Sequence, residues 1–150
     1  MLKIRVPATS ANLSVGFDTL GIALNIYNEF GFEKSSFDNV DAFESKFRTN
    51  NLVLKSYKRF GYYNIKYVPV KILPFRIDIP SSRGLGSSAS CIVAGVMAAN
   101  ILSGLNLKKE DLLDLCASIE GHPDNVLPAL VGGLCAAFMA HEKYYYKKYI

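Results

Sequence analysis

Residues 80–90 read Pro-Ser-Ser-Arg-Gly-Leu-Gly-Ser-Ser-Ala-Ser, a turn rich in glycine and serine that we call the glycine-serine loop. Residues 72–79 before it predict a strand, and the apolar residues of 88–103 after it have helical spacing. A helix start is the positive end of the helix dipole and has backbone N–H groups without intrahelical partners. Glycine lets such a backbone approach a ligand closely. The loop therefore predicts an anion site, most simply for phosphate.

The same loop has a second interpretation, in which Ser87 or Ser88 only caps the helix. It is not the Walker pattern, because no Lys-Ser or Lys-Thr pair follows Gly86. It is not the dinucleotide pattern Gly-x-Gly-x-x-Gly either, because position 89 is alanine. The loop by itself leaves phosphate binding and simple capping both open.

The composition is that of a globular domain with a core, which can stand alone or belong to a larger two-domain protein. The chain has 150 residues, 50% of them hydrophobic, and a net charge of +4 that is too modest to require nucleic acid. Cys91, Cys116 and Cys135 are odd in number, far apart and in apolar runs. They indicate buried thiols in a reducing compartment, not a disulfide or metal set.

The chain offers no evident targeting or membrane segment. Residues 1–7 alternate charged and apolar residues, unlike a signal peptide. The longest apolar stretch, around 91–102, is too short to span a bilayer and contains Gly95 and Asn100. We therefore expect a cytoplasmic protein without a membrane partner.

The pattern along the chain predicts strands first and helices later, which is typical of an α+β domain. The expected strands are 2–6, 20–33 with Ile26, Phe30 and Phe32 on one face, two short strands within 65–79 broken by Pro69 and Pro74, and 134–140. The expected helices are 51–60, 88–103, 108–119 and a short one capped by Asp124 or Asn125. Residues 7–18 form a long loop of the kind that binds ligands, and 141–150 are expected to be a solvated basic tail.

Three blocks of the chain, in matching order and spacing, resemble a known family. Residues 7–13 (Pro-Ala-Thr-Ser-Ala-Asn-Leu) with 16–18 (Gly-Phe-Asp) resemble the first motif of homoserine kinases. Residues 84–89 (Gly-Leu-Gly-Ser-Ser-Ala) are similar to the phosphate loop of the wider GHMP small-molecule kinase superfamily. A third block typical of homoserine kinases resembles 120–126 (Glu-Gly-His-Pro-Asp-Asn-Val) with Pro128, Ala129, Gly132 and Gly133.

The resemblance implies the ribosomal-protein-S5 domain 2-like fold, a mixed sheet packed against helices. Residues 1–150 would be the N-terminal ATP-binding domain of the family. The family's C-terminal domain carries another glycine-rich motif and arginines that hold the substrate carboxylate, and 1–150 contain neither. We therefore expect an N-terminal fragment or a shortened form whose own activity is open.

The family also implies roles for individual residues. The loop would contact the ATP phosphates through Arg83, Gly84, Leu85, Gly86, Ser87, Ser88, Ala89 and Ser90. Ser88 and Glu120 would share Mg²⁺ as the catalytic pair, and Glu120 would suit a cation because it ends a helix at the negative end of the dipole. Substrate contacts would come from Asn12, Asp18, His122, Asp124 and Asn125. Asp18 would pair with the substrate ammonium and not act as a base.

The resulting hypothesis is an ATP- and Mg²⁺-dependent kinase that phosphorylates L-homoserine in threonine biosynthesis. Two alternatives are a different GHMP small-molecule kinase and a non-catalytic nucleotide-binding module, the latter motivated by the missing C-terminal half. A third, an RNA-binding domain, draws on the fold's ribosomal relatives and the basic tail and predicts salt-sensitive RNA binding. Under the leading hypothesis the partners are small molecules and not nucleic acid, and a homodimer is allowed because the family often dimerises.

Overall fold

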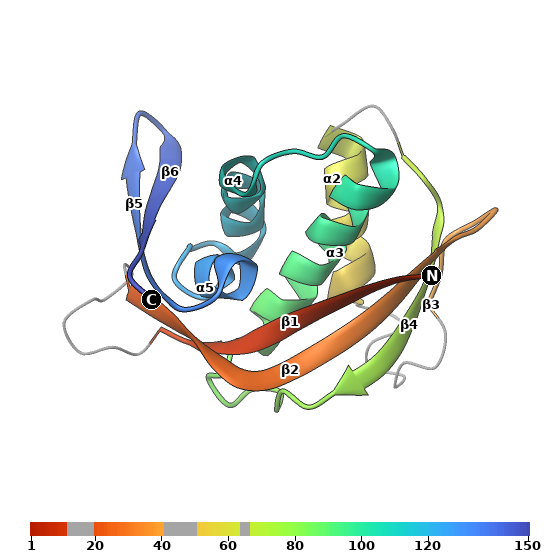
Figure 1. Ribbon diagram of the computed structural model, residues 1–150. Helices are drawn as coiled ribbons and strands as arrows, with labels where there is room; N and C mark the ends of the chain where they lie inside the picture. Colours follow the sequence, from red (N-terminus) through yellow and green to blue (C-terminus); the bar gives the residue numbers. More distant parts are fainter. Residues whose placement is uncertain (12–19, 41–50, 64–66) are drawn as a thin grey trace.

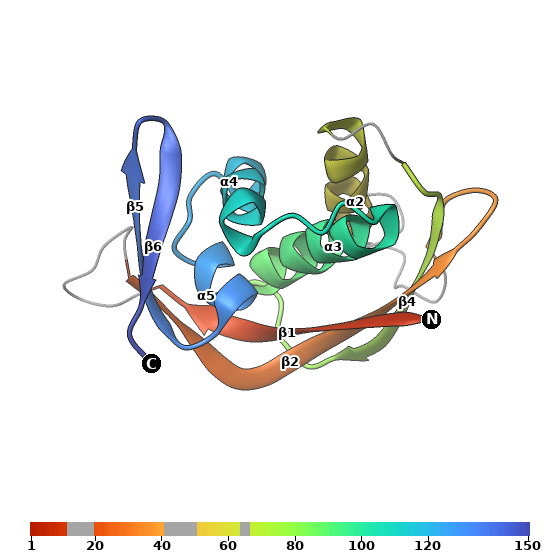
Figure 2. The same cartoon turned by 45° about the horizontal axis from the view of Figure 1, so that its top comes forward.

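The computed structural model describes residues 1–11, 20–40, 51–63 and 67–150, with a mixed sheet and helices on one of its faces (Figures 1 and 2). The elements are, in chain order, β1 (Leu2–Ser10), β2 (Leu20–Lys34), β3 (Asn39–Val40), α2 (Leu52–Tyr63), β4 (Val70–Ile77), α3 (Ser87–Ser103), α4 (Lys109–Glu120), α5 (Val126–Val131), β5 (Leu134–Ala140) and β6 (Lys143–Lys148). The α+β prediction, with a mixed sheet against helices, is confirmed.

Strand β2 organises the sheet, because β1, β4 and β5 all pair with it in antiparallel fashion. The short β3 pairs in parallel with β4, and β6 pairs with β5. Phe30 and Phe32 point from β2 into the core and are each 1% exposed. The expectation that Ile26 shares their face is wrong, because Ile26 is 37% exposed.

Helix α3 is the central helix and is buried around most of its circumference, as expected of a helix that is apolar on all sides. Its Gly95 lies against the backbone of α2: a Cβ at this position would come within 2.3 Å of the Val53 carbonyl oxygen. The helix has 17 residues, and no helix in the described part of the chain is both long and apolar enough to cross a membrane.

The helix ends follow the signals in the sequence. Gly104 and Gly121 end α3 and α4 in the left-handed conformation, each with a backbone hydrogen bond back into its helix. Asn51 caps α2, since its Oδ1 accepts a hydrogen bond of 2.9 Å from the Leu54 N–H. Helix α2 nevertheless continues through Gly61, where the sequence predicts a stop.

Two expectations about strands are wrong. Instead of two short strands broken by Pro74, β4 is continuous from Val70 to Ile77, and the register of β2 shifts between Glu29 and Phe30, where Pro74 pairs. Instead of a solvated tail, the chain end contains β6, which forms a hairpin with β5. His141 and Glu142 connect these two strands with φ values of 52° and 62°. Such a turn normally has Asn or Gly at these positions, so the local sequence does not predict it.

The three cysteines are free and buried, as the sequence predicts. Burial raises the pKa of the Cys116 thiol from 9.0 to about 12. Cys116 lies on the inner face of α4 and is 0% exposed. The folded protein therefore keeps this thiol protonated at a pH where the unfolded chain ionises it.

We predict that Cys116 contributes to the loss of stability at alkaline pH. Its folded pKa is raised, so its contribution is complete below pH 9 and is lost as the pH rises from 9 to about 12. The expected slope is about 1.4 kcal/mol per pH unit for one thiol. Urea unfolding at a series of pH values measures it.

The control is Cys116→Ala, which loses packing at every pH but has no thiol to ionise. Its free energy of unfolding should therefore fall less steeply above pH 9 than that of the parent. Parallel curves for the two proteins would contradict the prediction.

Candidate functional site

The glycine-serine loop connects β4 to α3 and is attached to β1. Its backbone is left-handed at Ser82, Gly84 and Gly86, with φ values of 58°, 70° and 72°. The Thr9 N–H donates a hydrogen bond of 3.0 Å to the Leu85 carbonyl. The loop therefore reverses direction within a few residues while β1 holds its middle.

The two loop glycines have different reasons to be glycine. A Cβ at Gly86 would lie 2.1 Å from Thr9 Oγ1, whereas a Cβ at Gly84 would meet nothing within 4 Å. Gly86 is thus required by its packing against β1 as well as by its φ, and Gly84 only by its φ. We expected both glycines to let a ligand approach the backbone. Gly84 fits that role, whereas Gly86 is already explained by its packing against Thr9.

Helix α3 begins directly at the loop, and of its first three residues Ser87 and Ser88 are accessible to solvent whereas Ala89 is buried. Gly86 occupies the N-cap position and has no side chain, so Ser87 and Ser88 lie inside the helix and do not cap it. The first intrahelical bond runs from the Ser90 N–H to the Gly86 carbonyl at 2.9 Å. The amides of residues 87–89 precede that bond and lack intrahelical acceptors. The interpretation in which Ser87 or Ser88 only caps the helix is therefore wrong, and the anion site remains a prediction.

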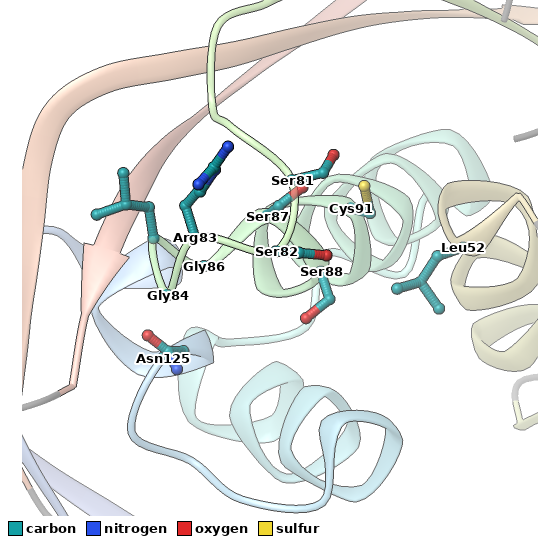
Figure 3. Close-up of a pocket in the computed structure, with 11 residues that line it drawn as sticks. Leu52, Ser81, Ser82, Arg83, Gly84, Gly86, Ser87, Ser88, Cys91 and Asn125 are labelled. Atoms are coloured by element: carbon teal, nitrogen blue, oxygen red, sulfur yellow. The ribbon is translucent and has the colours of Figure 1, made fainter. Parts of the chain in front are cut away.

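A pocket of about 540 Å³ lies over this first turn (Figure 3). This volume is in the usual range for small-molecule sites. Leu52 from the start of α2 lines one end of the pocket and Asn125 from the start of α5 lines the other. Val53, in contrast, is 1% exposed and belongs to the core. The complete lining is Leu52, Ser81, Ser82, Arg83, Gly84, Leu85, Gly86, Ser87, Ser88, Cys91 and Asn125.

Two of the predicted phosphate residues do not line this pocket with their side chains. Ala89 and Ser90 are each 0% exposed. The Ser90 hydroxyl donates a hydrogen bond of 2.7 Å to the Ser87 carbonyl and accepts one of 3.1 Å from Asn28 Nδ2. The expectation that Ser90 offers its hydroxyl to phosphate is therefore corrected: this side chain supports the loop from below.

The structure brings together Ser88 and Glu120, which are 32 residues apart in the chain. The Ser88 hydroxyl donates to the Glu120 carboxylate, with Oγ 3.0 Å from Oε1 and 3.2 Å from Oε2. Ser88 lies in the first turn of α3, and Glu120 is the last residue of α4. Both side chains provide oxygen, the ligand type that Mg²⁺ prefers.

The three polar residues after α4 form a second group beside this pair. His122 Nδ1 is hydrogen-bonded to the Asp124 carboxylate, and His122 Nε2 lies 4.0 Å from Glu120 Oε1. The Asn125 N–H donates to Asp124 Oδ1 at 3.1 Å. Of the three, Asn125 also lines the pocket, while Asn12 and Asp18 from the first loop lie outside the described residues.

Sequence reasoning did not identify Thr9 and Asn28 as site residues. The Thr9 hydroxyl donates a hydrogen bond of 2.8 Å to Asn125 Oδ1, and Asn28 contacts Ser90. The sequence could have identified Asn28, because strand alternation places it on the same face as Phe30 and Phe32. A buried amide on that face needs hydrogen-bond partners. Thr9 lies within the first family motif, but strand alternation does not predict its burial, because the β1–β2 register shifts between Pro7 and Thr9.

The family model for the GHMP kinases N terminal domain matches residues 51–133, more than half of the chain. The chain therefore belongs to the GHMP kinase family. Several of its relatives are homoserine kinases. It is 45% identical to a homoserine kinase of Clostridium beijerinckii over 99% of this chain and 51% of that protein.

Two solved structures are also similar over essentially the whole chain. A protein of Listeria monocytogenes assigned as a homoserine kinase has a TM-score of 0.87 and 34% identity, covering 100% of this chain and 54% of that one. A homoserine kinase of Cytophaga hutchinsonii has a TM-score of 0.78 and 29% identity, covering 98% and 51%. The expected fold of this family is thereby confirmed. The chain spans about half the length of the curated relatives it matches.

We predict that Gly86→Ala destabilises the protein more than Gly84→Ala. Both substitutions place alanine in the left-handed region, which costs about 1–2 kcal/mol. Only Gly86→Ala also forces a Cβ against Thr9, and overpacking of this kind adds about 1–3 kcal/mol. Urea unfolding of both variants measures the difference, and equal losses would show that the contact with Thr9 is not tight.

Proposed function

We propose that this chain is the N-terminal, ATP-binding half of a homoserine kinase. The reaction is transfer of the γ-phosphoryl group of ATP to the hydroxyl of L-homoserine, giving O-phospho-L-homoserine. The observation that carries the proposal is the meeting of Ser88 and Glu120 beside the open first turn of α3. The choice of homoserine as acceptor rests on the relatives that share 45% of its residues and bear that name.

The phosphates of ATP would lie against the glycine-serine loop. The amides of Ser87 and Ser88 and the positive end of the α3 dipole favour an anion there. Arg83 is exposed on the same loop and adds a positive charge. Phosphoryl transfer depends mainly on positioning and on neutralising charge, and these groups supply both.

Mg²⁺ fits the oxygen atoms that meet at Ser88 and Glu120. In nucleotide sites this ion commonly takes one or two carboxylates together with phosphate oxygens and water. The described residues contain no cluster of three or more His, Cys, Asp or Glu, so the protein would supply Ser88 and Glu120 and the nucleotide the rest. When bound, the ion neutralises charge on the transferring phosphoryl group.

The substrate would lie beside this pair, next to His122, Asp124 and Asn125. Asp124 fixes the His122 ring through Nδ1 and accepts a hydrogen bond from the Asn125 backbone N–H, so the Asp124 carboxylate connects the other two residues. Asp18 and Asn12 would bind the amino-acid end of homoserine from the first loop, with Asp18 pairing with the ammonium group. We assign no general base, and the hydroxyl proton would pass towards the γ-phosphate.

The proposal also covers the setting of the protein. We place it in the cytoplasm, in threonine biosynthesis, with small molecules as ligands and neither membrane nor nucleic acid as partner. A homodimer remains an expectation from the family.

One observation favours a second candidate function, a non-catalytic nucleotide-binding module. The chain spans about half the length of its curated relatives, so the remaining half of a full enzyme lies outside these 150 residues. Calorimetric titration separates the two candidates. A bare module binds Mg-ATP weakly and does not bind homoserine.

The proposed reaction is tested by a coupled assay of ADP release on the longest natural form of the protein. Homoserine-dependent turnover is the expected result. Turnover with another small alcohol and none with homoserine would assign the chain to a different GHMP kinase.

We predict that Ser88→Ala and Glu120→Gln each reduce turnover by at least about tenfold. Even residues that contact a metal only indirectly typically cost about 10–100-fold when they are substituted. Ser88 is exposed, so its substitution should leave the free energy of unfolding within about 0.5 kcal/mol of the parent. Turnover is measured at saturating Mg²⁺ and stability by urea unfolding.

The matched control is Ser118→Ala. Ser118 is an exposed serine on α4, two residues before Glu120, and its hydroxyl bonds to the Leu115 carbonyl of its own helix. This variant should retain parental turnover. Turnover of the Ser88 and Glu120 variants within about twofold of the parent would remove both residues from the metal site.

A further inference from the structure

We propose that Asn28 is a positioning residue for nucleotide binding, because its amide joins the two ends of the glycine-serine loop. Asn28 lies in the middle of β2, far from the loop in sequence and outside the pocket lining. One test of this inference, the measurement of nucleotide affinity, rests on the proposed function. The inference also has a measurement that needs no nucleotide.

The amide of Asn28 contacts the chain on both sides of the loop. Its Oδ1 accepts a hydrogen bond of 3.0 Å from the N–H of Ile79, the residue before the loop. Its Nδ2 donates a hydrogen bond of 3.1 Å to the hydroxyl of Ser90, in the first turn of α3. One planar side chain therefore fixes the distance between Ile79, just before the loop, and the helix that follows the loop.

The contact continues into the first turn of α3. The Ser90 hydroxyl accepts from Asn28 and donates to the Ser87 carbonyl at 2.7 Å. Ser87 carries the first of the helix amides that lack intrahelical acceptors. The orientation of those amides is thus connected to β2 through Ser90.

Asn28 is itself rigidly held. It is 1% exposed and pairs with Val6 of β1 on one side and Ile77 of β4 on the other. Ser90, its partner, is 0% exposed. Hydrogen bonds between buried groups have no competing water, and an unpaired partner would be costly.

This arrangement has a consequence for binding. Ordering a loop around a ligand costs conformational entropy, and a loop that is already held in the binding conformation avoids that cost. Without Asn28, the loop ends would separate more freely and the amides would diverge. Nucleotide affinity would then fall even in molecules that are fully folded.

Asn100, near the C-terminal end of α3, provides a matched control. Asn100 of α3 is also buried and also makes two hydrogen bonds through its amide, both to Leu107 after the helix. Its Nδ2 donates to the Leu107 carbonyl at 3.2 Å and its Oδ1 accepts from the Leu107 N–H at 2.7 Å. Asn100→Ala should therefore lower stability much as Asn28→Ala does, without touching the loop.

The experiment is titration of Mg-ATP into the longest natural form of the parent, Asn28→Ala, Ser90→Ala, the double variant and Asn100→Ala. Loss of two buried hydrogen bonds should weaken the affinity of Asn28→Ala by about tenfold. Asn100→Ala should bind within about twofold of the parent. Ser90→Ala should weaken binding as well, and the double variant should be little worse than Asn28→Ala because both act through one contact.

Hydrogen exchange of the Thr9 and Ser90 amides, which donate to the Leu85 and Gly86 carbonyls of the loop, is measured on the same proteins without nucleotide. Asn28→Ala should accelerate exchange at these amides, and Asn100→Ala should leave it at the parental rate. If Asn28→Ala fails to fold, Ser90→Ala supplies both measurements, since it removes the link to α3 and keeps the Ile79 bond.

The outcomes separate the two proposals. A parent that does not bind Mg-ATP overturns the proposed function, while fast exchange of the Thr9 and Ser90 amides in Asn28→Ala still supports the role of Asn28. Parental exchange rates and affinity in Asn28→Ala overturn the positioning role alone. Equal losses of affinity in Asn28→Ala and Asn100→Ala overturn it too, because they show a general effect of stability.

Discussion

The start of helix α3 is fixed by its contact with Thr9 of β1, and the site is arranged around that contact. The Thr9 backbone holds the loop at Leu85, its hydroxyl holds Asn125 at the start of α5, and Gly86 fits against it with no room for a side chain. A residue of the sheet therefore sets the position of two segments that line the pocket. This explains how a loop with three left-handed residues keeps one shape.

Local chemistry in the sequence predicted where the central helix begins. The order of strand, glycine-serine loop and apolar helix indicates a helix start with free amides, and that start is observed. The pairing of Ser88 with Glu120 came from the family resemblance together with the position of Glu120 at a helix end, and the two side chains are in hydrogen-bond contact. The first signal is local, whereas the pairing of two residues 32 positions apart needed the family resemblance.

The parts that the sequence did not predict depend on contacts between distant segments. Whether Ser90 faces a ligand or the core is decided by Asn28, which is 62 residues away. The strand β6 forms because the His141–Glu142 turn returns the chain onto β5, although its Lys and Tyr residues have no apolar alternation. Likewise, β4 passes through Pro74 because β2 shifts register there. In each case the partner segment overrides the local preference.

Two helix ends of opposite polarity meet beside the pocket, at the Ser88–Glu120 contact. Helix α3 presents its N-terminus, which carries partial positive charge, while α4 presents its C-terminus, which carries partial negative charge, with Glu120 as its last residue. The Ser88–Glu120 contact shows that these ends are adjacent. A phosphate against α3 would repel the Glu120 carboxylate across the few ångströms that separate the helices unless a cation lay between them. Under the proposed function an anion and a cation would therefore bind here together, and neither helix end alone would specify that pair.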